Sequence, residues 1–113
     1  MENINPYQLI LTTCPNQEEA NNLAHTLLEN HLAACVSIVP TIQSIYKWEG
    51  RIVSDAEVLL FIKTRRECYA AIEEVFLQQH SYEIPELIVL PIETGLPSYL
   101  KWLDESVAPR MEN

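Results

Sequence analysis

The sequence of 113 residues carries sixteen acidic side chains against seven lysines and arginines, which gives a net charge of −9. This length is typical of one domain, 1–113, whose core we expect to span residues 7–107. The acidic balance argues against nucleic acid and anionic membranes as partners, because both favour basic surfaces. No apolar run approaches the ~18 residues of a membrane span, and the first residues lack the pattern of a signal peptide. We therefore expect a cytoplasmic protein.

A short strand and an amphipathic helix are predicted at the start of the chain. The segment Tyr7–Cys14 is rich in β-branched and apolar residues, which favours a strand. The residues that follow resemble a capping box, in which Asn16 caps a helix and Glu19 reaches back to it. Apolar residues then recur at helical spacing, so the helix is predicted over residues 17–31. The same capping pattern recurs at Thr64–Glu67.

A long β-hairpin is predicted over residues 33–63. Apolar and polar residues alternate through its first arm, and Glu49-Gly50 is the plausible tight turn, because glycine tolerates a positive φ. Pro40 makes the first arm an edge strand or one with a bulge. The continuous apolar run Val58–Ile62 favours a second arm that is buried on both faces.

A second helix, a loop, a strand and a final helix complete the predicted elements. Apolar spacing indicates a helix over residues 65–79, and the polar loop His80–Pro85 follows it. The segment Glu86–Ile92 is predicted to be the fourth strand. A C-terminal helix is expected to begin near Pro97, which suits a first helical turn, and residues 108–113 are expected to form a frayed tail.

The order β-α-β-β-α-β plus a helix predicts the ferredoxin-like split β-α-β sandwich, an α+β fold. Its sheet is antiparallel, with the strands in the order 4-1-3-2 and the proline-bearing second and fourth strands at its edges. In this topology Cys14, Glu86 and the loop 80–83 should converge at one end of the sheet. An ordinary polar loop explains the same residues equally well, and composition does not decide between the two.

The hairpin is too long for the rest of the sheet. A first strand of about eight residues can pair with only half of the third strand, so the tip at residues 43–55 should project beyond the sheet. An exposed apolar arm is an aggregation hazard unless a partner covers it. We therefore expect an obligate homo-oligomer, with Trp102 of the last helix near the interface. The apolar residues of the tip are Ile45, Tyr46, Trp48 and Ile52.

Cysteines and histidines give few further signals. The three cysteines form no C-x-x-C pair, which argues against a disulfide framework or a structural zinc site. Cys35 and Cys68 are expected to be small buried residues, whereas Cys14 stands at a strand-to-helix junction. His25 and His31 are expected to be structural or surface residues.

Five short motifs stand in an informative order: LAACV at 32–36, YKWEG at 46–50, IKT at 62–64, HSYEIPE at 80–86 and YLKW at 99–102. Together they closely resemble the CutA family of divalent-cation tolerance proteins, over roughly residues 7–107. The resemblance implies a ferredoxin-like homotrimer, a cytoplasmic location, and a part in divalent metal tolerance that includes copper binding. It implies no established catalytic activity, and its fold is similar to that of PII signalling trimers.

The resemblance also implies a metal site. The family's loop reads H-P-Y-E-x-P-E, and Ser81 stands here in place of its proline. His80 and Glu86 are thereby implied as ligands, and an imidazole with a carboxylate suits Cu(II). In some members a cysteine of the first strand takes part. That position is Thr12 here, and Cys14 lies two residues on, on the same face of a strand. Whether Cys14 takes its place stays open.

Three functions follow from these observations. The first is a trimeric, non-catalytic protein that binds divalent cations, Cu(II) above all. The second is a PII-like module that holds an anionic metabolite in a cleft between subunits, and the third is an oligomeric scaffold without a ligand. An enzyme is disfavoured, because no nucleophile elbow, phosphate loop or H-E-x-x-H motif is present. The residues expected to line the cleft are Tyr46, Trp48, Lys63, His80, Tyr82, Glu83 and Glu86.

Overall fold

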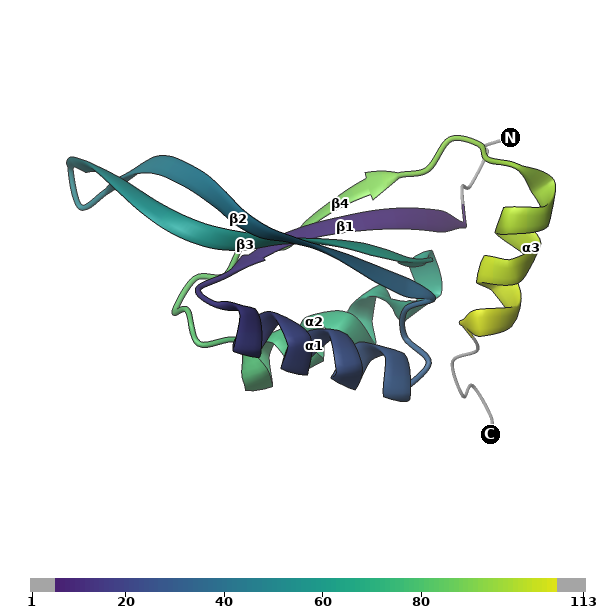
Figure 1. The fold of residues 1–113 in the computed structure, drawn as a ribbon. Coiled ribbons are helices and arrows are strands. Elements are labelled where there is room, and N and C mark those ends of the chain that lie inside the picture. The colour runs from purple at the N-terminus through teal and green to yellow at the C-terminus, as the bar shows by residue number, and fades with distance from the viewer. Residues whose placement is uncertain (1–5, 108–113) are drawn as a thin grey trace.

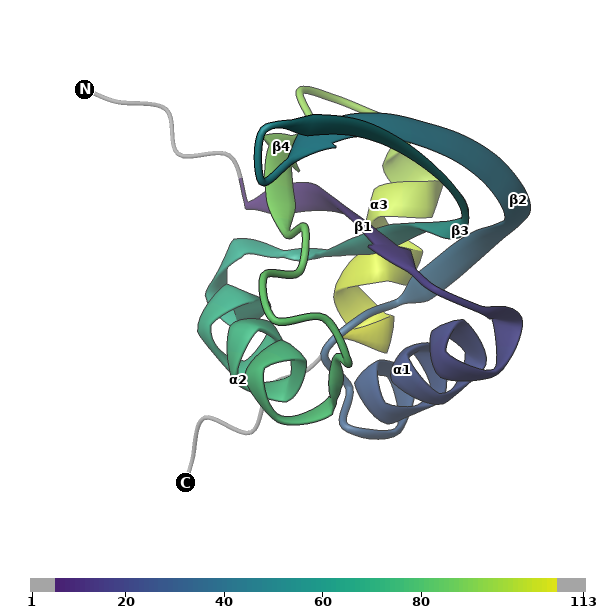
Figure 2. The same cartoon turned by 90° about the vertical axis from the view of Figure 1, so that its left-hand side faces the viewer.

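Four strands form one antiparallel sheet, and two helices cover one of its faces. The computed structural model describes residues 6–107, so residues 1–5 and the predicted tail at 108–113 lie outside the described residues. The helices α1 and α2 lie beneath the sheet, and α3 lies at the end opposite the hairpin tip (Figure 1, Figure 2). The elements are β1 (Tyr7–Cys14), α1 (Gln17–Glu29), β2 (Cys35–Trp48), β3 (Arg51–Arg65), the 3-10 turn η1 (Arg66–Cys68), α2 (Tyr69–Gln79), β4 (Ile88–Pro91) and α3 (Pro97–Ser106).

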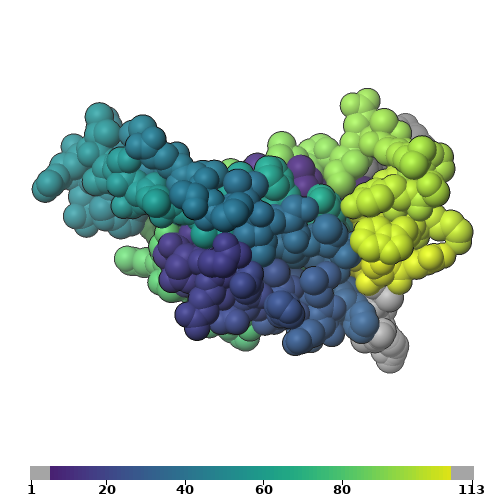
Figure 3. Space-filling view, viewed as in Figure 1, coloured from purple at the N-terminus to yellow at the C-terminus, as the bar shows by residue number. Residues whose placement is uncertain are grey.

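The strand order confirms the predicted fold. The order is β2-β3-β1-β4, which is the predicted sequence of strands read from the other edge. β1 pairs along its whole length with β3, from Tyr7 opposite Arg65 to Cys14 opposite Val58. Beyond Val58, β3 has only β2 as a partner in the described chain. The strand pair that continues alone projects well past the body of the molecule (Figure 1, Figure 3), as the strand lengths predict.

The prolines and the turn also lie where the sequence predicts. The register between β2 and β3 shifts between Val39 and Ile42, on either side of Pro40. Pro91 lies in the edge strand β4. The chain reverses at Glu49 and Gly50, whose φ angles are 51° and 80°. Both residues therefore lie in the left-handed region, as a two-residue hairpin turn requires.

The two predicted capping boxes have different outcomes. The cap of α1 is confirmed, because Asn16 Oδ1 accepts a hydrogen bond of 2.8 Å from the Glu19 amide. The Glu19 side chain does not reach back, however. It accepts a hydrogen bond from the amide of Ser81 instead. The second capping box is wrong, since Thr64 is a buried residue of β3 whose hydroxyl donates to the carbonyl of Leu32 at 2.6 Å.

Three elements are shorter than predicted, and one of them is α2, which begins at Tyr69, after η1, and not at residue 65. α1 ends at Glu29, and the chain leaves it through His31, whose φ of 59° lies in the left-handed region. β4 begins at Ile88 and not at Glu86, because its pairing with β1 covers only four residues. The segment before Ile88 belongs to a loop that Tyr82 holds against β3 through a 2.6 Å hydrogen bond to Glu57.

The core lies between the sheet and the two helices. Cys68 is fully buried as expected, whereas Cys35 is only half-buried. Thr12 and Cys14 are both fully buried and lie on the face of β1 that turns towards the helices. None of the helices in the described part of the chain is long and apolar enough to cross a membrane. The largest buried side chains of the core are Ile10, Leu27, Leu60, Ile62, Ile72, Phe76 and Leu103.

The hairpin tip leaves large apolar side chains in solvent. Ile52 is 76% exposed and Ile45 is 65% exposed, and Trp48 is half exposed. Burying apolar surface contributes roughly 25 cal/mol per Å², so this tip is unfavourable as a free arm. Trp102 on α3 is also exposed, while its neighbour Leu103 is fully buried in the core.

The hairpin turn allows a paired test of backbone strain. A Cβ at Gly50 would meet no atom within 4 Å, so only its φ of 80° resists a side chain. Gly50→Val should lower the free energy of unfolding by about 1–2 kcal/mol. Glu49→Asn should raise it by about 0.5 kcal/mol, because asparagine tolerates the left-handed region better. Urea unfolding measures both changes, and equal stability of Gly50→Val and the parent would contradict the turn.

Candidate metal centre

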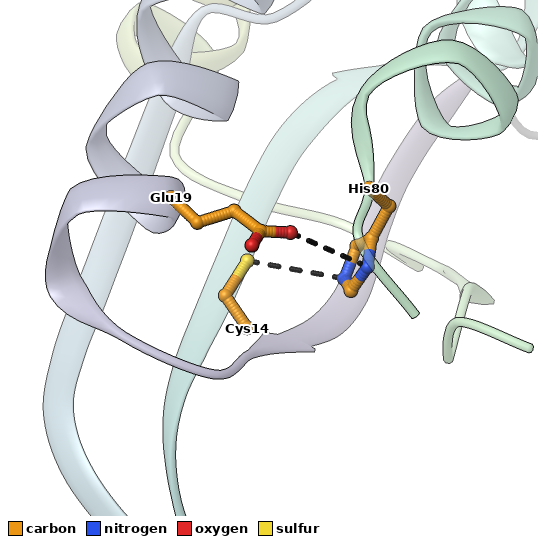
Figure 4. A group of neighbouring side chains, drawn as sticks. All are labelled: Cys14, Glu19 and His80. Atoms are coloured by element: carbon orange, nitrogen blue, oxygen red, sulfur yellow. Dashed lines mark hydrogen bonds and ion pairs between the residues drawn. The ribbon is translucent and has the colours of Figure 1, made fainter. Parts of the chain in front are cut away.

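A thiol and an imidazole meet at the end of the sheet below the hairpin. Cys14 is the last residue of β1, and His80 directly follows the last turn of α2. Cys14 Sγ lies 4.0 Å from His80 Nε2, and both side chains are fully buried. The topology therefore brings together two of the residues that the sequence marks as ligands (Figure 4).

Glu19 completes the group. It stands in the first turn of α1, and its Oε2 atom lies 3.5 Å from His80 Nδ1. The same oxygen accepts a 2.8 Å hydrogen bond from the amide of Ser81. Figure 4 shows the Glu19 carboxylate and the Cys14 thiol both directed at the His80 ring. The three donor atoms lie within 4.8 Å of one another. Among the described residues, Cys14, Glu19 and His80 form the one group of three that could hold a metal ion.

Each ring nitrogen of His80 makes a hydrogen bond to a backbone group. The amide of Tyr82 donates to Nδ1 at 3.1 Å, so Nδ1 carries the lone pair. Nε2 then carries the hydrogen and donates it to the carbonyl of Thr13 at 2.8 Å. These bonds assign a neutral tautomer. Phe76 and Tyr82 pack against the ring, with centroids 5.8 and 4.9 Å away.

Cys14 is a protonated thiol in the absence of a cation. Burial raises its pKa to about 12, and the charges of Glu19 and Glu57 add to the effect. A thiol in this state is a poor nucleophile, because the thiolate is the reactive form. A bound divalent cation would favour the thiolate, since it replaces the proton and offsets the two carboxylates.

Glu86 lies outside this group. It lines an adjacent cavity of about 550 Å³, and partial burial and the charge of Glu57 raise its pKa although the residue as a whole is exposed. The structure therefore brings Cys14 and His80 together with Glu19, and places Glu86 in the neighbouring space. The residues that line this cavity are Thr13, Ser44, Ile45, Tyr46, Trp48, Glu57, Tyr82, Glu83, Ile84 and Glu86.

The expected cleft is only partly assembled within one chain. Tyr46, Trp48, Tyr82 and Glu83 share the 550 Å³ cavity with Glu86, as the sequence suggests. Lys63 does not line it, because its ammonium group donates to Ser37 Oγ at 2.9 Å across the β2–β3 pair. Within one chain, the cavity thus holds carboxylates without that cation. His25 binds the Asn21 carbonyl on the exposed side of α1, as expected of a surface residue.

A second cavity borders the group of Cys14, Glu19 and His80. It has a volume of about 430 Å³ and opens between the first turn of α1 and the end of α2. Glu19 and His80 form part of its wall, and the Glu19 side chain keeps 20% of its surface in solvent there. The other lining residues are Asn16, Glu18, Asn22, Leu23 and Gln79.

Comparison with known proteins identifies the family. A sequence model of the CutA1 divalent ion tolerance protein family matches residues 8–106. The chain belongs to this family. The resemblance to CutA that the sequence motifs indicate is thereby confirmed. The family is named for divalent-cation tolerance, and the described chain offers a donor set at the end of its sheet that suits such ions.

CutA relatives from distant organisms match nearly the whole chain. The CutA homolog of Xenopus laevis is 50% identical over 95 residues, which are 84% of this chain and 63% of that protein. The divalent-cation tolerance protein CutA of Thermus thermophilus is 42% identical over 99 residues, with 88% and 96% covered. The crystal structure of CutA1 from Oryza sativa has a TM-score of 0.88 at 44% identity, with 95% and 96% covered. The chain thus spans less than two thirds of the Xenopus protein.

Sequence reasoning missed Glu19 as a member of the group. Its pattern suggested a helix cap, because a glutamate three residues after Asn16 is typical of a capping box. A different signal was available: Glu19 lies five residues after Cys14, and a tight strand-to-helix turn returns the first helical turn to the end of the strand. The contact to Ser81 depends on where the loop after α2 arrives, which the local sequence does not specify.

Ionisation of Cys14 is expected only at strongly alkaline pH. Its pKa is raised to about 12, whereas a free thiol ionises near ~8.5. Its contribution to stability is fully present below ~8.5 and is lost as the pH rises towards the folded value, because the unfolded thiol ionises first. Ultraviolet thiolate absorbance of the parent minus that of Cys14→Ser reports this group alone. A transition near ~8.5 in that difference would contradict the burial argument.

Proposed function

We propose that this CutA-family chain is a non-catalytic, homotrimeric protein that binds a divalent cation, Cu(II) in particular. The observation that carries the proposal is the close approach of the Cys14, Glu19 and His80 donor atoms, within 4.8 Å of one another, at one end of the sheet. Imidazole, thiolate and carboxylate together suit late first-row metals, and copper(II) heads the general order of affinity. The family's link to divalent-cation tolerance supports the same ion class.

The donor set fits a metal by its chemistry, with a small inward movement. Bonds of ~2.0–2.3 Å to one ion require donor atoms closer together than the 4.8 Å over which these three spread. Cys14 would lose its proton, and its charge together with that of Glu19 would balance a divalent ion. His80 would have to release one hydrogen bond, from the Tyr82 amide or to the Thr13 carbonyl, to free a ring nitrogen.

The homotrimer is supported by the exposed arm and by the edges of the sheet. The hairpin tip holds apolar side chains in solvent, and stable assemblies bury such surface. β2 and β4 are the edge strands, and their outer backbone groups have no strand partner in the described chain. A second and a third copy would supply both apolar cover and further strand pairing.

Variants of the three donors test the metal site. His80→Ala should lower Cu(II) affinity at least ~10-fold. Loss of a residue that only hydrogen-bonds to a metal ligand already lowers metal affinity by about that factor, and His80 is proposed as a ligand itself. Glu19→Gln should lower it less, since the amide keeps an oxygen but loses the charge. Glu86→Gln should have a smaller effect than Glu19→Gln, because Glu86 lies in the adjacent cavity. Calorimetric titration measures each, and affinity should rise with pH because protons compete for the thiol.

A control variant and two further outcomes test the place of the ion and the metal function itself. His25→Ala is the matched histidine control and should bind copper like the parent, because its ring faces solvent on α1. If Glu86→Gln weakened binding more than Glu19→Gln, the ion would lie in the cavity and not at the group around His80. If the parent bound no divalent ion, the scaffold function would replace the metal function.

Removal of the arm tests the assembly. Replacement of residues 43–55 by Asn-Gly should turn the trimer into monomers or aggregates, since the tip carries the exposed apolar surface. Light scattering with size-exclusion chromatography measures the mass, and His80→Ala should stay trimeric as the control. A folded trimer without the arm would overturn the role given to it.

A further inference from the structure

The 550 Å³ cavity at the root of the arm has walls of two kinds. One side is formed by β2 and β3 of the arm, and the other by the loop between α2 and β4. Its volume lies within the ~300–1,000 Å³ of small-molecule sites. The three donors of the proposed metal centre are not among its lining residues, so the cavity is separate from that centre.

The polar part of the cavity is acidic. Glu57 is 9% exposed, and one of its carboxylate oxygens accepts the 2.6 Å hydrogen bond of the Tyr82 hydroxyl. Glu83 and Glu86 join it, and among the described residues that line the cavity there is no lysine, arginine or histidine. Partial burial raises the pKa of Glu86, and the charge of Glu57 adds to the effect. A bound cation would relieve this repulsion.

The remaining walls are largely aromatic. Tyr46 and Trp48 are each partly exposed in the single chain, so their rings can take a contact wherever a second copy does not cover them. The hydroxyl of Tyr46 donates to Asp55 and that of Tyr82 to Glu57, so both phenols are held with their oxygens on carboxylates. Aromatic faces beside carboxylates attract cations that are only weakly hydrated, through the ring quadrupole.

A bare metal ion is a poor fit for this space. Within residues 6–107, the carboxylates of the cavity form no set of three whose oxygens approach one another closely enough to hold an ion. A larger cation can touch carboxylates that stand apart and aromatic rings between them. We infer that this cavity binds a small organic ammonium cation, with Glu57 and Glu86 supplying charge and Trp48 and Tyr82 supplying aromatic contact.

Tetramethylammonium and tert-butanol are a matched pair of probes. They have the same number of heavy atoms and similar shapes, and they differ in charge. The intact protein, freed of metal with EDTA, should bind tetramethylammonium in the millimolar range, about 1–10 mM for so small a ligand. Binding is followed by Trp48 fluorescence in a Trp102→Phe background and by calorimetry. tert-Butanol and equal ionic strength of sodium chloride should give no saturable signal.

Single substitutions locate the site. Glu57→Gln keeps an acceptor for Tyr82 and should weaken tetramethylammonium binding about fivefold or more. Trp48→Leu, measured by calorimetry, should weaken it about fivefold. Glu29→Gln is the matched charge control, because Glu29 is exposed at the end of α1, and it should bind like the parent. If Glu57→Gln fails to fold by circular dichroism, Glu86→Gln takes its place with the same expected direction.

Several outcomes would overturn the inference. Equal binding of tert-butanol would show an apolar cleft, and an equal loss in Glu29→Gln would show only the general negative charge. Tighter binding of Mg²⁺ than of tetramethylammonium, abolished by Glu57→Gln, would show a metal site. No binding by the intact oligomer would mean that the cavity is closed, for example by a cationic side chain of a second copy. None of these results depends on copper binding at His80, so the two proposals fail separately.

Discussion

The difference in length between β1 and β3 governs the rest of the molecule. β3 has 15 residues and β1 has 8, so β1 ends at Cys14, opposite Val58, midway along its neighbour. The chain turns there into α1, which brings Glu19 under the end of the strand. The other half of β3 continues with β2 as the arm. The group of Cys14, Glu19 and His80 and the cavity at the root of the arm both lie where β1 ends beside β3.

Thr13 and Tyr82 contact both the His80 ring and the neighbouring cavity. Thr13 lines the cavity, while its carbonyl accepts the hydrogen of the His80 ring. Tyr82 gives its amide hydrogen to the same ring and its hydroxyl to Glu57 in the cavity. An ion that took the lone pair of His80 Nδ1 would release the Tyr82 amide. Tyr82 therefore connects the His80 ring and the cavity through a single residue of the loop.

Sequence patterns anticipated the fold well because they act locally or along a strand. Pro40 and Pro91 identified the edge strands, since a residue without an amide hydrogen suits an edge, and Gly50 identified the turn. The site was anticipated in part. Strand direction alone brings Cys14 to the loop that starts at His80. Glu19 and Glu86 were assigned less well, because the destination of a flexible carboxylate depends on which amide or cavity lies within reach, and that is settled only by tertiary packing.

The carboxylate of Asp104 on α3 connects distant parts of the chain. It accepts a 2.9 Å hydrogen bond from the Tyr7 hydroxyl and pairs with Arg65, so it holds the first residue of β1 and the last residue of β3. The bond to Tyr7 spans 97 positions of sequence. During synthesis, these two contacts of Asp104 can form only after α3 has left the ribosome. A fold closed by such non-local contacts forms slowly and depends on its last helix for completion.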